Sequence, residues 1–161
     1  MKNTRHTLLK ARLDLVRRDL DPIVARITPD LLDWVPTKGM RTIVGQLVEI
    51  IAAEMQLIAL LKDGQSLSDD DAKEILGDCE SLDNLRRALL DVRQQTFAYL
   101  ASLSEDDLAE EISFEGGWFA SLMLPTVPRA EVFVNIADHE WYHVGQLTSY
   151  LWARGENPYD W

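Results

Sequence analysis

The sequence has little of what marks an exported or membrane-spanning protein. Cysteine occurs once, as Cys79, so no disulfide can form within the chain, and a free thiol fits a reducing compartment. The longest apolar stretch, 43–61, is interrupted by Gln46, Glu49, Glu54 and Gln56, and we therefore expect it to be too polar to cross a bilayer. The first residues show no apolar block followed by a small-residue cleavage site. We expect a cytoplasmic protein without a signal peptide.

Positive charge is also scarce: the chain has 16 Lys and Arg residues against 27 Asp and Glu residues, which gives a formal net charge of −11. A surface this acidic repels phosphate backbones and anionic lipid headgroups. We therefore expect neither nucleic acid nor a membrane as a partner. With 161 residues, of which 47% are hydrophobic, residues 1–161 are expected to form one domain whose core needs no disulfide or metal to hold it.

Four long segments show apolar residues spaced by threes and fours, which is typical of helices. The first should kink or restart at Asp21-Pro22. The second begins at the capping residue Thr42 and ends at Gly64, and the third begins at the capping residue Ser81. The last is expected to take Pro128 as its first residue.

Shorter features lie between these segments. Thr28-Pro29, Asp69 to Asp71 and Ser104 each predict the start of a short helical turn, and Gly77 is expected to end the second of them. Residues 112–124 are irregular, with Gly116-Gly117 as a candidate hairpin turn. The fold class is therefore all-α: an antiparallel four-helix bundle with short extra helices and an irregular arm before the last helix, long enough to be a crossover or a lid.

The last helical segment contains His139-Glu140-Trp141-Tyr142-His143, which reads HExxH. Side chains four residues apart lie on one face of a helix, so both imidazoles can reach one divalent metal ion. On a helical wheel the apolar stripe centres near Glu140, and both histidines fall on its shoulder, where a neighbouring helix can supply a ligand. Glu140 is the candidate catalytic general base, or else it hydrogen-bonds within the bundle.

Two histidines rarely suffice for a catalytic metal, which commonly has three protein ligands and an open position. His6 falls in a turn that we expect to be frayed, so the third ligand must be a carboxylate from another helix or be absent. The second segment offers Glu49 and Glu54, which lie about 140° apart on the wheel and are not expected to bind the same ion. The wheel favours Glu54, at the centre of the apolar stripe, because a buried carboxylate needs a partner.

Over nearly its whole length the sequence resembles the DinB/YfiT-like family. That family has a serine or threonine at the start of the second helix, a histidine seven residues on and a glutamate five residues after that. Its last helix carries H-x3-H and a Gly-Gln pair, followed by a glycine and a proline. The matching positions here are Thr42, Glu49, Glu54, His139, His143, Gly145-Gln146, Gly155 and Pro158.

The resemblance implies a four-helix bundle, often a homodimer, with a three-ligand metal site between the second and the last long helices. It selects Glu49, which stands where the family has a histidine, as the third ligand beside His139 and His143. Glu54 is then expected to pair with an arginine or to support a histidine. Two imidazoles and one carboxylate suit Zn, Ni, Fe(II) or Mn.

Activities known in the family include thiol-dependent transferases and isomerases, in which the metal lowers the pKa of a small thiol. The resemblance therefore implies a metal-dependent enzyme with a small-molecule substrate, a thiol-dependent transferase or related hydrolase, which uses a divalent metal ion and a low-molecular-weight thiol. That thiol would come from solution, because Cys79, between Asp78 and Glu80, is a poor nucleophile.

Two other functions stay open at this stage. An HExxH metallopeptidase needs a further ligand downstream, and after His143 the only carboxylates are Glu156 and Asp160. A non-enzymatic dimeric bundle, with a stress-response or binding role and a degenerate metal site, would explain why position 49 is a glutamate.

Overall fold

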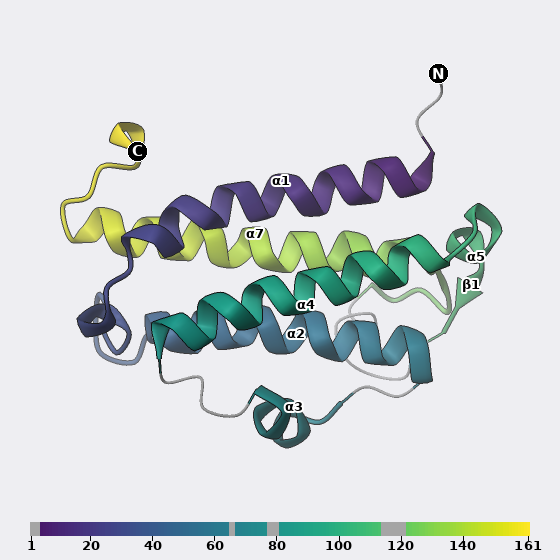
Figure 1. Cartoon of the computed structure of the whole chain (residues 1–161), viewed down its shortest axis with the longest axis horizontal. Helices are drawn as coiled ribbons and strands as arrows, with labels where there is room; N and C mark the ends of the chain where they lie inside the picture. Colours follow the sequence, from purple (N-terminus) through teal and green to yellow (C-terminus); the bar gives the residue numbers. More distant parts are fainter. Residues whose placement is uncertain (1–3, 65–66, 77–80, 114–121) are drawn as a thin grey trace.

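The computed structural model describes residues 4–64, 67–76, 81–113 and 122–161. Four long helices lie side by side as a bundle, and shorter helical pieces lie at its ends and along one side (Figure 1), which confirms the predicted all-α fold class. The long helices are α1 (Arg5–Arg26), α2 (Ile43–Asp63), α4 (Leu82–Ser102) and α7 (Ala130–Ala153). The short elements are η1 (Pro29–Leu31), α3 (Asp69–Leu76), α5 (Glu105–Ala109), β1 (Glu111–Ile112), β2 (Val127–Pro128) and η2 (Pro158–Asp160).

The long helices do not all alternate in direction. Arg12 and Asp19 of α1 contact Asp138 and Trp141 of α7 in the same order along the chain, so these two helices are parallel. Glu54 and Leu61 of α2 likewise contact Arg93 and Tyr99 of α4 in the same order, so α2 and α4 are parallel as well.

The predicted antiparallel arrangement therefore holds for α1 with α2 and for α4 with α7, but not for α2 with α4. Figure 1 shows the consequence: the chain returns from one end of the bundle to the other between α2 and α4, and α3 lies on this path. The crossover is thus not the arm before the last helix. Residues 114–121 of that arm, with the predicted turn at Gly116-Gly117, lie outside the described ranges, as do Gly77 and Cys79.

The predicted capping residues start their helices. Thr42 accepts a hydrogen bond from the backbone N–H of Gly45, Ser81 accepts one from Asn84, and Ser104 forms a reciprocal capping box with Asp107. Each satisfies a backbone donor that the first helical turn leaves without a partner. Gly64 ends α2 with φ of 70°, a conformation that glycine adopts without steric cost.

The structure corrects the predicted helix restart at Pro22 and the predicted helix start at Pro128. Helix α1 runs unbroken through Pro22, because its buried face on both sides of the proline keeps packing against the bundle, and the alternative of a kink there stays a prediction. Pro128 is not the first residue of the last helix but belongs to β2, opposite Glu111, and α7 begins at Ala130. The backbone hydrogen bonding between these two segments continues after the proline, because the N–H of Arg129 donates to the carbonyl of Glu110 at 2.9 Å.

His6 was expected in a frayed turn, and this is wrong. Its Nδ1 lies 2.8 Å from Glu105 Oε1 and its Nε2 lies 2.6 Å from the carbonyl oxygen of Leu103. Because both neighbours are acceptors, they favour the doubly protonated imidazolium, and the hydrogen bond to Glu105 above all raises the pKa of His6. The start of α1 is therefore tied to α5.

The core consists of two apolar clusters with a polar layer between them. One cluster surrounds Leu47, Ile50 and Leu85, and the other surrounds Leu13 and Phe133. Each long helix contributes a buried charged side chain at the height between these clusters: Arg17 from α1, Glu54 from α2, Arg93 from α4 and Glu140 from α7.

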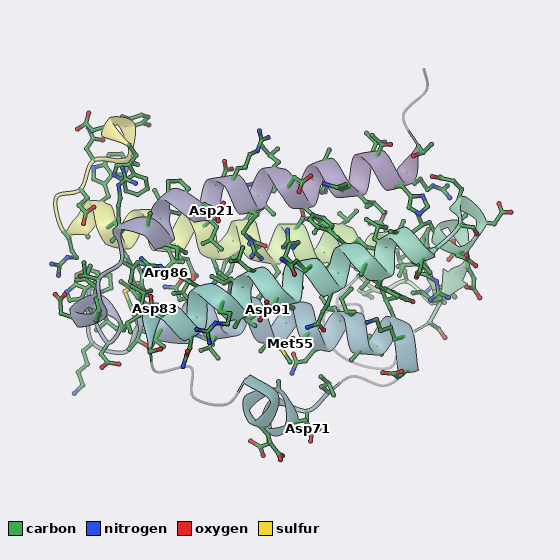
Figure 2. The ribbon with its side chains drawn as sticks, viewed as in Figure 1. Asp21, Met55, Asp71, Asp83, Arg86 and Asp91 are labelled. Carbon is green, nitrogen blue, oxygen red and sulfur yellow. The ribbon has the colours of Figure 1, made fainter. Side chains whose placement is uncertain are left out.

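The outer faces carry the acidic surface expected from composition. Asp21 on α1, Asp71 on α3, and Asp83 and Asp91 on α4 are all exposed (Figure 2). Within the described part of the chain, α2 is the one helix long and apolar enough to cross a membrane, so the expectation that it is too polar was wrong on that criterion. In this fold α2 is a core helix, which packs on α4 and α7 and buries Glu54.

Candidate metal centre

Helices α2 and α7 bring three predicted metal ligands together. The candidate donor atoms of Glu49, His139 and His143 all lie within 4.8 Å of one another. The two imidazole rings, one turn apart on α7, have centroids 4.7 Å apart. The family register, which pointed to Glu49, therefore selected the glutamate that lies beside the histidines, and the helical wheel, which favoured Glu54, did not.

His143 is held with one nitrogen turned toward this cluster. Its Nδ1 lies 3.3 Å from Oε1 of Gln46, and with the amide in this orientation the oxygen accepts, which assigns the ring hydrogen to Nδ1. Its Nε2 then presents a buried lone pair, which has no hydrogen-bond partner among the described residues and lies 3.6 Å from Glu49 Oε2. An unpartnered buried lone pair beside a carboxylate fits a metal ligand, and a hydrogen bond to the other nitrogen is the usual way to orient such a ligand.

The protonation of the two histidines suits the same role. Burial, followed by the positive charge of Arg41, lowers the pKa of His139. Burial, followed by His139 and Arg41, lowers the pKa of His143 to about 4, although a hydrogen bond with Gln146 opposes this. Both imidazoles are therefore neutral at pH 7, and a neutral imidazole is the form that binds metal.

Glu49 already has a cationic neighbour. Arg41, just before α2, makes an ion pair with Glu49 Oε2 through Nη1. The Glu49 side chain is 34% exposed, whereas that of His143 is 2% exposed. The cluster therefore opens to solvent at the glutamate and is closed at His143.

Glu54, the alternative ligand, belongs to the polar layer instead. Arg93 Nε lies 2.8 Å and the hydroxyl of Thr96 lies 2.6 Å from its Oε1, and Arg93 Nη2 lies 3.1 Å from its Oε2. The expectation that Glu54 pairs with an arginine is confirmed. Because both oxygens are engaged, Glu54 has no need of a metal partner.

Glu140 is the second carboxylate of that layer. Arg17 Nε donates to its Oε1 at 2.7 Å, and Arg93 donates to its Oε2. Burial lowers the pKa of Arg93, but hydrogen bonds and the charges of Glu54 and Glu140 raise it above its ordinary value, so the arginine stays charged. The role of Glu140 as a general base stays a prediction, while this placement fits the alternative of hydrogen bonding within the bundle.

A hollow of about 530 Å³ lies elsewhere, between α1 and α4, and its lining includes Arg17, Arg93 and Phe97. Arg17 and Arg93 are already paired there with Glu54 and Glu140, and the predicted metal ligands do not line this hollow.

Sequence reasoning missed the partners of the predicted residues: Gln46 beside His143, Arg41 on Glu49, and Arg17 and Arg93 in the polar layer. One signal was available for Gln46, which lies three residues before Glu49 and therefore on the same side of α2. The arginines come from elements whose packing the sequence pattern does not fix.

Comparison with known proteins agrees with this fold. The sequence profile of the DinB superfamily matches residues 12–147. The crystal structure of a protein assigned to the DinB family, from Exiguobacterium sibiricum 255-15, superposes with a TM-score of 0.65 at 17% identity, covering 98% of this chain and 96% of that chain. No curated protein matches the sequence. With a profile match that spans most of its length, the chain belongs to the DinB superfamily.

Proposed function

We propose that this protein binds one divalent metal ion through Glu49, His139 and His143 and uses it as a metal-dependent enzyme. The observation that carries the proposal is the buried Nε2 of His143, which lacks a hydrogen-bond partner in the described part of the chain and lies 3.6 Å from a carboxylate oxygen. Burying such a lone pair without a partner costs about 1–3 kcal/mol, which a bound cation would recover.

The residues of the chain have distinct parts in this proposal. His143 forms the closed floor of the site, Gln46 fixes its ring, and the partly exposed Glu49 lies on the side from which a small molecule can enter. A divalent ion supplies Lewis acidity, which lowers the pKa of a thiol or a water that takes its open position.

On the strength of the family resemblance we propose a thiol-dependent transferase or related hydrolase, with a small-molecule substrate and a low-molecular-weight thiol from solution. The homodimer and the cytoplasmic location belong to the same proposal. We do not propose a metallopeptidase, because arginines engage both oxygens of Glu140 and the described strands, of two residues each, provide no edge for a peptide.

One observation favours a second candidate function, a non-enzymatic dimeric binding or stress-response bundle with a degenerate site. Arg41 already neutralises Glu49, so a side chain stands where a metal would supply positive charge. Metal uptake by the purified protein distinguishes the two candidates, because only the first requires a bound metal ion.

The test is metal analysis of protein purified without chelator, followed by Co²⁺ titration of the metal-free protein. We expect about one ion per chain, and about 10–100-fold weaker Co²⁺ binding in Glu49→Gln, because the amide loses the charge that attracts the ion. Glu131→Gln, an exposed glutamate in the first turn of α7, is the matched control and should bind as the wild type does. If the wild-type protein is purified without any metal and also fails to bind added Co²⁺, the result would favour the non-enzymatic bundle.

A further inference from the structure

Arg41 is a charged side chain in contact with the candidate metal centre, and the proposed metal-dependent enzyme gives it no part. It is the last residue before the capping residue Thr42, and its guanidinium pairs with Glu49, two helical turns further along α2. The Arg41 side chain is 53% exposed, so its outer part faces solvent at the open side of the cluster.

Two further contacts direct Arg41 to this place. The hydroxyl of Tyr150 on α7 donates to the carbonyl oxygen of Arg41 at 2.9 Å and so holds its backbone beside the helix that carries both histidines. Gly45 leaves room for the arginine stem, because a Cβ at that position would lie 3.0 Å from Arg41 Cγ. The fold therefore guides this side chain over the first turn of α2 and onto Glu49.

The contact with Glu49 competes with metal binding. Arg41 Nη1 is paired with Glu49 Oε2, and this is the oxygen that lies 3.6 Å from the unpartnered Nε2 of His143. An ion held between that oxygen and the imidazoles would take the place of the guanidinium. The donors of Arg41 would then be free at the mouth of the site.

The net charge at the open side of the metal-loaded site determines which small molecules it would attract. A divalent ion, one carboxylate and two neutral imidazoles carry a net charge of about +1, and Arg41 raises it to about +2. This is a local cationic site on a chain with a formal net charge of −11. A guanidinium offers parallel N–H donors that match the two oxygens of a carboxylate.

We propose that Arg41 is the counter-ion of Glu49 in the metal-free site and the recognition group for a carboxylate-bearing small molecule in the metal-loaded site. This inference rests on the proposed metal binding and adds to it a class of substrate. Arg41 is thus a substrate-positioning residue, which also makes metal uptake weaker than the ligands alone would allow.

The experiment measures Co²⁺ binding by visible absorption and then the change in the Co²⁺ bands when benzoate or its neutral analogue benzamide is added. Four proteins are compared: wild type, Arg41→Gln, Arg41→Lys and the control Arg87→Gln, which removes an exposed charge from α4. Arg41→Gln should bind Co²⁺ about three- to tenfold more tightly, because a competing cation is gone, and benzoate about tenfold or more weakly. Arg41→Lys keeps the charge but not the paired donors, so it should bind Co²⁺ as the wild type does and benzoate more weakly.

The outcomes separate this inference from the proposed function. If the wild type binds Co²⁺ but Arg41→Gln binds benzoate equally well, or if the wild type does not prefer benzoate to benzamide, Arg41 is not a recognition group. Weaker Co²⁺ binding in Arg41→Gln would overturn its role as a competing counter-ion. A wild type that takes up no Co²⁺ would remove the metal site and this inference together.

Discussion

The variant Glu140→Ala is expected to lose about 3–5 kcal/mol of unfolding free energy, although Glu140 lies within an HExxH motif. Its side chain is 1% exposed and accepts hydrogen bonds from both Arg17 and Arg93. Removing it leaves the two buried guanidinium groups of Arg17 and Arg93 sharing the carboxylate of Glu54. The expected cost is mainly that of an uncompensated buried charge, which is larger than the worth of an exposed ion pair.

The measurement is urea unfolding followed by circular dichroism, with Asp138→Ala as the control. Asp138 lies two residues earlier on α7, and its exposed ion pair with Arg12, at 3.3 Å, should contribute about 1 kcal/mol or less. If Glu140→Ala unfolds at the same urea concentration as the wild type, the buried layer contributes little. If it then loses only an activity, Glu140 is the general base that the motif first indicated.

The variant His143→Ala is expected to weaken Co²⁺ binding by more than about a hundredfold while the bundle stays folded. The reason is that His143 supplies the buried Nε2 at the floor of the cluster as a direct ligand. Its removal should therefore reduce metal affinity by more than the factor of about 10–100 that is typical for residues that only orient a ligand. Co²⁺ titration measures the affinity, and circular dichroism measures the helix content of the same samples.

His6→Ala is the matched control for this variant. It removes an imidazole that is bound to Glu105 and Leu103 near α5 and does not belong to the cluster. Co²⁺ should bind it as it binds the wild type. Equal affinity in His143→Ala and the wild type would mean that the ion is held elsewhere.

Local signals in the sequence predicted most of the fold. Thr42, Ser81 and Ser104 start helices because their side chains accept from backbone donors within four residues, a relation that needs no tertiary information. The helix restart expected at Pro22 and the helix start expected at Pro128 were wrong because both depend on packing. The buried face of α1 keeps that helix continuous, and pairing with β1 places Pro128 in β2. The parallel course of α2 and α4 depends on the connection that contains α3, whose path no local pattern determines.

The candidate site was predictable to the extent that it depends on spacing along one helix. His139 and His143 are one turn apart on any helix, and the register of the family supplied Glu49. A helical wheel could not decide between Glu49 and Glu54 as the ligand, because a carboxylate can lie either at the centre or at the edge of the apolar stripe of α2. It was decided by Arg93 of α4, which reaches Glu54, and by the packing of α7 beside Glu49.

The most direct measurement is a crystal structure of the protein grown with Zn²⁺, with diffraction data collected on both sides of the zinc absorption edge. If the proposal is right, one anomalous peak lies between α2 and α7, at about 2.0–2.2 Å from Glu49, His139 and His143, and Arg41 has moved off the carboxylate. Zinc bound at any other place, or imidazoles of His139 and His143 that point away from each other with Arg41 still on Glu49, would contradict it.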